Sequence, residues 1–181
     1  AYADEGVQLR KSGIRLPILV MNPEQSAYDE IIDYQLEPSI YSPEVLDSFI
    51  HHLILRQEHN FPVHIKLDTG MNRLGFTEEL LPPLLDTLQA QPEVYVKSVF
   101  SHLSVADDEA ENQFASNQIR TFDIMTGILA DRLSYKFERH LANSAGTANF
   151  NRAEYDMIRL GIGIFGLMDK NKKELENVLS L

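Results

Sequence analysis

The stretch Phe61–Phe100, FPVHIKLDTGMNRLGFTEELLPPLLDTLQAQPEVYVKSVF, contains one full unit of the pattern that decides the fold. A β-rich run from Pro62 to Asp68 precedes a loop that breaks at Gly70, and an amphipathic stretch then precedes a second β-rich run. Short apolar runs are typical of buried strands, and amphipathic stretches are typical of helices. Two strands joined by a crossover helix are parallel.

The same alternation extends along the chain and predicts an α/β fold. The predicted strands are Ile18–Asn22, Pro38–Ser42, Pro62–Asp68, Val94–Leu103, Phe137–Ala142, Met157–Leu160 and Ile164–Leu167. The predicted helices are Asp4–Lys11, Glu24–Tyr34, Pro43–Glu58, Glu78–Gln89, Glu109–Leu133 and a short one from Ser144. From Asp169 the strand pattern is lost, which makes this position a candidate domain boundary.

Two architectures are compatible with parallel strands that are buried on both faces. A doubly wound sheet normally has a Gly-rich phosphate turn after its first strand, and neither GxGxxG nor GxxxxGK[ST] occurs here. A (β/α)8 barrel of the TIM type fits better, although such barrels have eight strands and about 250 residues. We therefore expect residues 1–181 to form one partial barrel domain with about seven of the eight strands.

Composition limits the partners and the compartment. The 181 residues include no cysteine and carry a formal charge of −11, with 44% hydrophobic residues. This acidic balance argues against nucleic acid and against an anionic membrane surface, and no apolar run approaches the ~20 residues of a membrane span. Without cysteine there is no disulfide or thiolate chemistry. We expect a cytoplasmic protein with a small-molecule partner.

Three residues near the ends of predicted strands could carry chemistry. Arg73 follows the strand that ends at Asp68, in the loop where barrel active sites lie, and offers a permanent planar cation. Lys66 lies within that strand, where a buried ammonium is costly unless it is paired or neutralised. His102 follows the next strand, where an imidazole can orient another group. Alternatively, Arg73 is a solvated loop residue, Lys66 faces outward and His102 is structural.

Two later segments predict an anion site. HLANSAGT, His140 to Thr147, ends a strand at Asn143 and offers Ser144 as a helix cap, an arrangement that suits a phosphate. YDMIRLGIGIFGL places Arg159 before the tight turn that contains Gly161. Simple helix capping is the alternative for Ser144. Together the segments favour a phosphorylated aromatic cofactor, and the histidines and acids show no metal-ligand spacing, so we expect no metal.

Four ordered blocks, KLDTGMNRLGF, FSHLSVADD, HLANSAGT and IRLGIGIFGL, resemble the successive signatures of the alanine racemases. These are fold-type III barrel enzymes that depend on pyridoxal 5′-phosphate. The resemblance covers essentially the whole chain. It implies an isomerase that interconverts L-alanine and D-alanine for peptidoglycan in the cell wall, as a cytoplasmic homodimer.

The resemblance also implies a role for each candidate residue. Arg73 matches the arginine beside the phenolic oxygen of the cofactor, and Lys66 matches a lysine that is carbamylated in some members and supports that arginine. Arg159 matches the arginine that faces the pyridine nitrogen, and His102 matches the histidine that binds this arginine. Because a guanidinium retains its proton, the pyridine nitrogen stays unprotonated.

The remaining matches lie around the ring and the phosphate, and they are Asn143, Ser144, Gly161 and Ile162. Both catalytic bases of the family lack a counterpart in this chain. The lysine that attaches the cofactor stands in a segment like VKANAYGHG, and the second base is a tyrosine of a C-terminal β-domain. We therefore expect the parent protein to be the enzyme and this chain alone to be inactive.

Three other interpretations stay open. The parent could racemise another amino acid, such as lysine, serine or glutamate. The chain could be a non-catalytic pyridoxal phosphate-binding barrel of vitamin B6 homeostasis, although those proteins also keep the anchoring lysine. It could also be a structural module whose sites are vestigial.

Overall fold

A computed structural model describes residues 2–106 and 108–166. The chain divides into two compact units. The first consists of Ala1–Lys66 and Leu74–Ser98, and the second of Leu67–Arg73 and Val99–Leu181.

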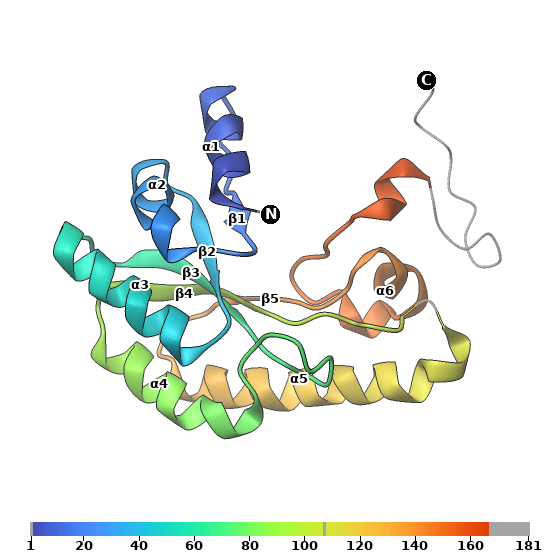
Figure 1. The fold of residues 1–181 in the computed structure, drawn as a ribbon. Helices are drawn as coiled ribbons and strands as arrows, with labels where there is room; N and C mark the ends of the chain where they lie inside the picture. Colours follow the sequence, from blue (N-terminus) through green and yellow to red (C-terminus); the bar gives the residue numbers. More distant parts are fainter. Residues whose placement is uncertain (1, 107, 167–181) are drawn as a thin grey trace. The chain divides into compact units, whose positions relative to one another are not determined.

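The first unit holds the first helices and strands of the chain (Figure 1). In chain order they are α1 (Ala3–Lys11), β1 (Leu19–Val20), the 3-10 helix η1 (Gln25–Ala27), α2 (Tyr28–Asp33), β2 (Glu37–Ile40), α3 (Pro43–Arg56), β3 (Phe61–Lys66), the 3-10 helix η2 (Glu78–Leu80), α4 (Leu81–Ala90) and most of β4 (Val94–Phe100). The second unit takes the end of β4 and then η3 (Glu109–Glu111), α5 (Asn112–Arg132), β5 (Glu138–His140), α6 (Ser144–Asn149), η4 (Asn151–Ala153) and η5 (Ile162–Phe165).

The strands of the described residues follow one another in sequence order across one sheet, β1-β2-β3-β4-β5. β1 pairs with β2 and β2 pairs with β3 in parallel, with Ser39 opposite His64. A doubly wound sheet would reverse its strand order at a switch point. Right-handed crossovers between strands in sequential order place every helix on the same face of the sheet. The topology is therefore that of a barrel wall, as the sequence predicts.

The expected helices and the first five expected strands are all found, with ends shifted by a few residues. The expected strands Met157–Leu160 and Ile164–Leu167 are wrong. Residues 157–160 are irregular, Ile164 lies within η5, and Leu167 and the boundary at Asp169 lie outside the described residues. Within the described part of the chain there are five strands, not seven.

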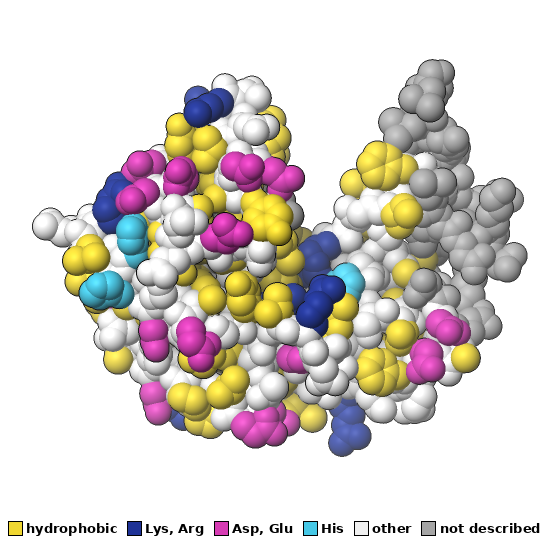
Figure 2. Space-filling view, viewed as in Figure 1, with side chains coloured by type: hydrophobic (Ala, Val, Ile, Leu, Met, Phe, Trp, Pro, Cys, Tyr) yellow, Lys and Arg dark blue, Asp and Glu magenta, His cyan; other side chains and the backbone are white. Residues whose placement is uncertain are grey.

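The spacing of hydrogen bonds beside β5 explains why residues 157–160 do not form a strand. The Asp156 amide donates to the Arg139 carbonyl at 3.0 Å and the Arg159 amide to the Ala142 carbonyl at 3.0 Å, so the bonds recur after three residues. A strand repeats every two residues. The following run LGIGIFG has the composition of a buried strand, but Ile162 is 61% and Ile164 55% exposed. Figure 2 shows that hydrophobic side chains, in yellow, are exposed at several places on the surface of the protein.

Local sequence signals explain α3. Ser42 accepts a hydrogen bond from the Val45 amide at 3.4 Å, and Pro43 occupies the first turn, where a missing N–H costs nothing. The helix ends at Gln57, which adopts a left-handed conformation with φ of 56°. Its buried residues recur at helical spacing and are Leu46, Phe49, Ile50 and Leu53.

The long helix α5 has 21 residues with one buried face, which includes Ile119, Phe122 and Leu129. Polar and charged side chains cover much of its other face, as expected of a helix on the outside of a globular protein. Within residues 2–106 and 108–166, no helix combines the length and the hydropathy needed to cross a bilayer.

A buried polar cluster joins three strands of the first unit. Glu37 of β2 accepts hydrogen bonds from the His64 ring at 2.8 Å and from the Lys97 ammonium at 2.7 Å. The other ring nitrogen of His64 contacts the Ser98 hydroxyl at 2.6 Å. Burial alone would raise the pKa of Glu37, but the two donors hold this pKa below its ordinary value of 4.5.

The substitution Glu37→Gln is expected to lower the free energy of unfolding by about 2 kcal/mol at pH 7, because the charged acceptor of the buried His64 ring and the half-buried Lys97 ammonium is lost. Since the pKa of Glu37 is depressed on folding, its stabilising effect is complete above pH 4.5 and disappears as the pH falls through the folded value. Chemical denaturation at pH 7 and below pH 4 measures both effects. The exposed Glu30→Gln on α2 is the control, and an equal loss at both pH values would contradict the assignment.

Candidate functional site

A guanidinium with a dense set of acceptors forms the centre of the second unit. The Arg159 guanidinium donates to the carbonyls of Ser101 at 2.5 Å, His140 at 3.2 Å and Leu141 at 3.2 Å. These carbonyls lie at the ends of β4 and β5. The central carbon of the Arg159 guanidinium lies 5.4 Å from the centre of the Phe100 ring. Burial lowers the pKa of Arg159 to about 10, so the guanidinium keeps its positive charge at neutral pH.

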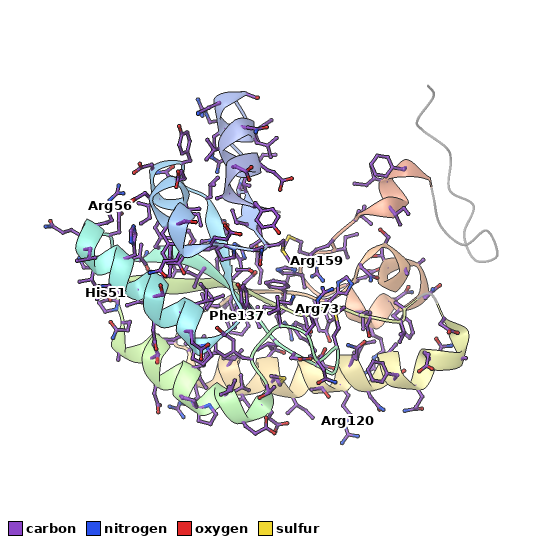
Figure 3. The ribbon with its side chains drawn as sticks, viewed as in Figure 1. His51, Arg56, Arg73, Arg120, Phe137 and Arg159 are labelled. Atoms are coloured by element: carbon purple, nitrogen blue, oxygen red, sulfur yellow. The ribbon has the colours of Figure 1, made fainter. Side chains whose placement is uncertain are left out.

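Two imidazoles complete this contact set. The Arg159 guanidinium donates to Nδ1 of His140 at 2.7 Å and approaches Nδ1 of His102 at 3.5 Å. A nitrogen that accepts from a guanidinium carries no proton, so His140 is neutral with its hydrogen on Nε2. The His140 ring and the three backbone carbonyls that bind Arg159 are therefore uncharged. Arg73 and Arg159 are labelled in Figure 3.

Sequence reasoning missed His140. This histidine is fully buried and stacks on Phe100, with ring centres 4.9 Å apart and planes at 3°. It ends β5, one strand after the strand that precedes His102. A histidine at a second strand end was the signal that could have found it, since residues just beyond parallel strands share one mouth.

Asn143 is the cap of α6 and joins it to the segment of His102. Its side-chain oxygen accepts from the Gly146 amide at 2.8 Å, and its side-chain nitrogen donates to the Leu103 carbonyl at 2.9 Å. The same nitrogen lies 3.5 Å from Nε2 of His102. Asn143 thus holds the first turn of α6 against the end of the preceding strand.

Ser144 brings the two segments of the predicted anion site together. Its hydroxyl oxygen accepts hydrogen bonds from the amides of Gly161 at 2.9 Å and Gly163 at 3.1 Å. Both lone pairs are then used, and the hydroxyl hydrogen is left for an external acceptor. The amide of Ile162 lies between these two donors in the chain. Because α6 has only six residues, the hydroxyl and the loop amides, and not a long helix dipole, define this place.

Arg73 ends a loop, Leu67–Arg73, that Asp68 folds upon itself. The Asp68 carboxylate accepts from the amides of Gly70 at 2.9 Å and Asn72 at 3.1 Å. Gly70 has a φ of +126°, and an added Cβ would lie 3.3 Å from the Phe114 ring, so glycine is required there. The Arg73 side chain is exposed.

Lys66 belongs to the first unit, where it is the last residue of β3 and is only 8% exposed. Its carbonyl accepts from the Phe76 amide at 2.8 Å. The expected outward-facing alternative for Lys66 is therefore wrong. In the second unit, Arg159 approaches His102, which approaches Asn143, and Ser144 separately binds the Gly161 amide. The two sets of contacts meet because Asn143 and Ser144 are neighbours in the chain.

These residues provide two kinds of chemical group at the strand ends. One is a cation that is held by carbonyls and imidazoles and cannot readily give up its proton. The other is a hydroxyl and a glycine turn that suit an anionic oxygen. Both lie after the carboxyl ends of β4 and β5, where proteins built on parallel strands bind small molecules.

Comparison with known proteins agrees with a protein of parallel strands that binds a small molecule at the strand ends. The family model "Alanine racemase, N-terminal domain" matches residues 1–169. The alanine racemase of Synechocystis sp. is 35% identical over 171 residues, which are 92% of this chain and 45% of the relative. The alanine racemase structure of Clostridium difficile 630 superposes with a TM-score of 0.85 at 26% identity, over 94% of this chain and 44% of that chain. That of Bacillus anthracis with bound L-Ala-P gives 0.83 at 28% identity, over 94% and 44%.

The chain belongs to the family of the alanine racemase N-terminal domain. Its fold is that of the TIM-type barrel of these isomerases, and the family depends on pyridoxal 5′-phosphate. The chain spans about half the length of the curated relatives it matches.

The residues of this structure fit that cofactor. A phosphate needs hydrogen-bond donors, and the Ser144 hydroxyl, whose oxygen is held by the amides of Gly161 and Gly163, can supply one. A pyridine nitrogen that stays unprotonated needs a donor that keeps its own proton, and Arg159, which is held by backbone carbonyls and by His140, is such a donor.

Replacing Ser144 by alanine removes the acceptor of two amides. We expect hydrogen exchange at the amides of Gly161 and Gly163 to become about fivefold faster, because a net hydrogen bond contributes about 1 kcal/mol. NMR exchange measurements on the labelled chain test this. Ser116→Ala, which removes an exposed hydroxyl within α5, is the control. Unchanged protection at both glycines would contradict the role of Ser144.

Proposed function

We propose that residues 1–181 form a pyridoxal 5′-phosphate-binding barrel domain and that the protein which carries them is an alanine racemase. The observation that supports this most strongly is the Arg159 guanidinium, which three backbone carbonyls and His140 hold in a site without a described carboxylate partner. A carboxylate at this place would accept a hydrogen bond from a protonated pyridine nitrogen and stabilise it, whereas a guanidinium can only donate and favours the unprotonated nitrogen.

Each site residue has a proposed role toward the cofactor. Arg159 donates to the pyridine nitrogen, with His102 and His140 fixing its orientation. Arg73 donates to the phenolic oxygen, and Lys66 supports it. The phosphate is held by Ser144, Gly161 and Ile162, while Asn143 positions Ser144 through the cap of α6.

The cofactor supplies an electron-withdrawing ring that acidifies the α-proton of an amino acid joined to it. The residues of this chain tune that ring and exclude water from it. Arg159 keeps its proton and limits the withdrawal of electrons, which favours return of a proton to the α-carbon. Racemisation needs an acid or base on each face of the substrate. None of the tyrosines or lysines in the 181 residues matches those two groups, so we propose that this chain provides cofactor binding and not proton transfer.

The proposed substrate is alanine, and the proposed product pair is L-alanine and D-alanine for peptidoglycan. A homodimer in the cytoplasm is the proposed context. Residues that select among alanine, lysine, serine and glutamate are not identified in this chain, so the substrate rests on the family alone.

A titration of the chain with pyridoxal 5′-phosphate tests the binding role. Phosphorus NMR and visible absorption follow the binding, and borohydride reduction with peptide mapping then locates any attached lysine. We expect saturable binding of one cofactor without a stoichiometrically modified lysine, because no lysine here matches the anchor.

Arg159→Lys is the diagnostic variant in this titration, and Arg120→Lys on the exposed face of α5 is its control. A single ammonium cannot serve the carbonyls and imidazoles that the planar guanidinium binds. We expect the dissociation constant to rise about tenfold in the first variant only, which corresponds to about 1.4 kcal/mol. Absence of saturable binding, or one lysine trapped at full stoichiometry, would contradict the proposal. The second result would favour an autonomous cofactor-binding protein.

A further inference from the structure

Ser101 connects the guanidinium of Arg159 to two strands. It directly follows β4 and is 2% exposed. Its carbonyl accepts from the Arg159 guanidinium at 2.5 Å, and its amide donates to the His140 carbonyl at 3.3 Å. The backbone of Ser101 therefore fixes one side of the Arg159 contact set.

The side chain of the same residue holds a different segment. Its hydroxyl donates to the Leu67 carbonyl at 2.8 Å and lies 2.9 Å from the Thr69 hydroxyl. A serine hydroxyl has one hydrogen, and the Leu67 carbonyl can only accept. The Thr69 hydroxyl is therefore the donor to Ser101. All of these groups are buried, so each bond is made without competing water.

The segment held by Ser101 is the base of the loop Leu67–Arg73. The Leu67 amide also donates to the Phe100 carbonyl at 2.8 Å, and the Asp68 carboxylate folds the loop upon itself. A loop that is internally folded moves as one piece about its base. A shift at Thr69 therefore displaces Arg73 at the other end of the loop.

We propose that Ser101 is a positioning residue that sets the separation between Arg159 and the loop of Arg73. This inference rests on the proposed function, in which the two arginines contact the ring nitrogen and the phenolic oxygen of one rigid cofactor. Because the ring fixes the distance between those two atoms, the two guanidinium groups must be held at a matching separation. One residue does so by binding Arg159 through its carbonyl and the loop through its hydroxyl.

Thr69→Val is the most informative variant because it keeps the shape of the side chain and removes only the donor to Ser101. In the described residues the hydrogen-bond path from Thr69 to Arg159 runs through Ser101, so the proposal expects an effect on the guanidinium to follow this path. Ser101→Ala removes the hydroxyl itself. Thr69→Ser keeps a hydroxyl and should behave like the parent chain. Ser12→Ala, whose exposed hydroxyl donates to the Gln8 carbonyl at 2.9 Å, is the matched control.

The first measurement is the rate of proton exchange at the Arg159 guanidinium, which NMR detects in the labelled chain without cofactor. We expect exchange to be roughly fivefold faster in Thr69→Val and in Ser101→Ala, as the loss of one hydrogen bond implies. Thr69→Ser and Ser12→Ala should match the parent. Faster exchange at the Gly70 and Asn72 amides with no change at Arg159 would overturn the proposal, since the loop would then loosen on its own.

The second measurement is the dissociation constant of pyridoxal 5′-phosphate for the same variants. It should rise roughly fivefold in Thr69→Val and Ser101→Ala and stay constant in the other two. Equal affinity in all variants would also overturn the positioning role. If the parent chain itself fails to bind the cofactor, the proposed function fails, while the exchange of Arg159 still decides whether Ser101 couples it to the loop.

Discussion

The structure of the site depends on the cost of burying one positive charge. An isolated guanidinium in a protein interior is unfavourable unless its hydrogens are bound. Here three carbonyls and the neutral His140 ring bind the Arg159 guanidinium, and the Phe100 ring lies against its face. The strand ends therefore converge on Arg159, because their carbonyls are the groups that compensate for its desolvation.

Parallel strands make this compensation possible. In a barrel wall the carboxyl ends of neighbouring strands lie along one edge, so carbonyls just beyond β4 and β5 point to a common place. The same edge carries the His102 ring and the cap of α6. A site of this kind requires little from any single motif, since the backbone supplies most of the acceptors. For this reason the Arg159 cation is surrounded mainly by uncharged backbone carbonyls.

The sequence predicted the architecture well because alternating strands and helices carry strong periodic signals. It also joined Ser144 to the turn at Gly161. The prediction of Ser144 as the helix cap is wrong, because the side chain that accepts from the first turn of α6 is that of Asn143. It failed where composition and backbone pairing disagree: the run LGIGIFG is as apolar as a buried strand, yet its residues form η5 and an exposed surface. His140 was missed because stacking on Phe100 and binding of Arg159 leave no sequence motif, and its place at a strand end was the one available signal. The roles of the site residues toward the cofactor remain predictions.

The most direct test of the central claim is alanine racemisation by a chimera in which this chain replaces the aligned segment of the Synechocystis alanine racemase. The account predicts that the chimera interconverts L-alanine and D-alanine. It also predicts that Arg159→Lys lowers kcat/KM by at least about tenfold, whereas Arg120→Lys leaves it unchanged. A folded chimera that binds pyridoxal 5′-phosphate but does not racemise alanine, or one in which Arg159→Lys has no effect, would contradict the account.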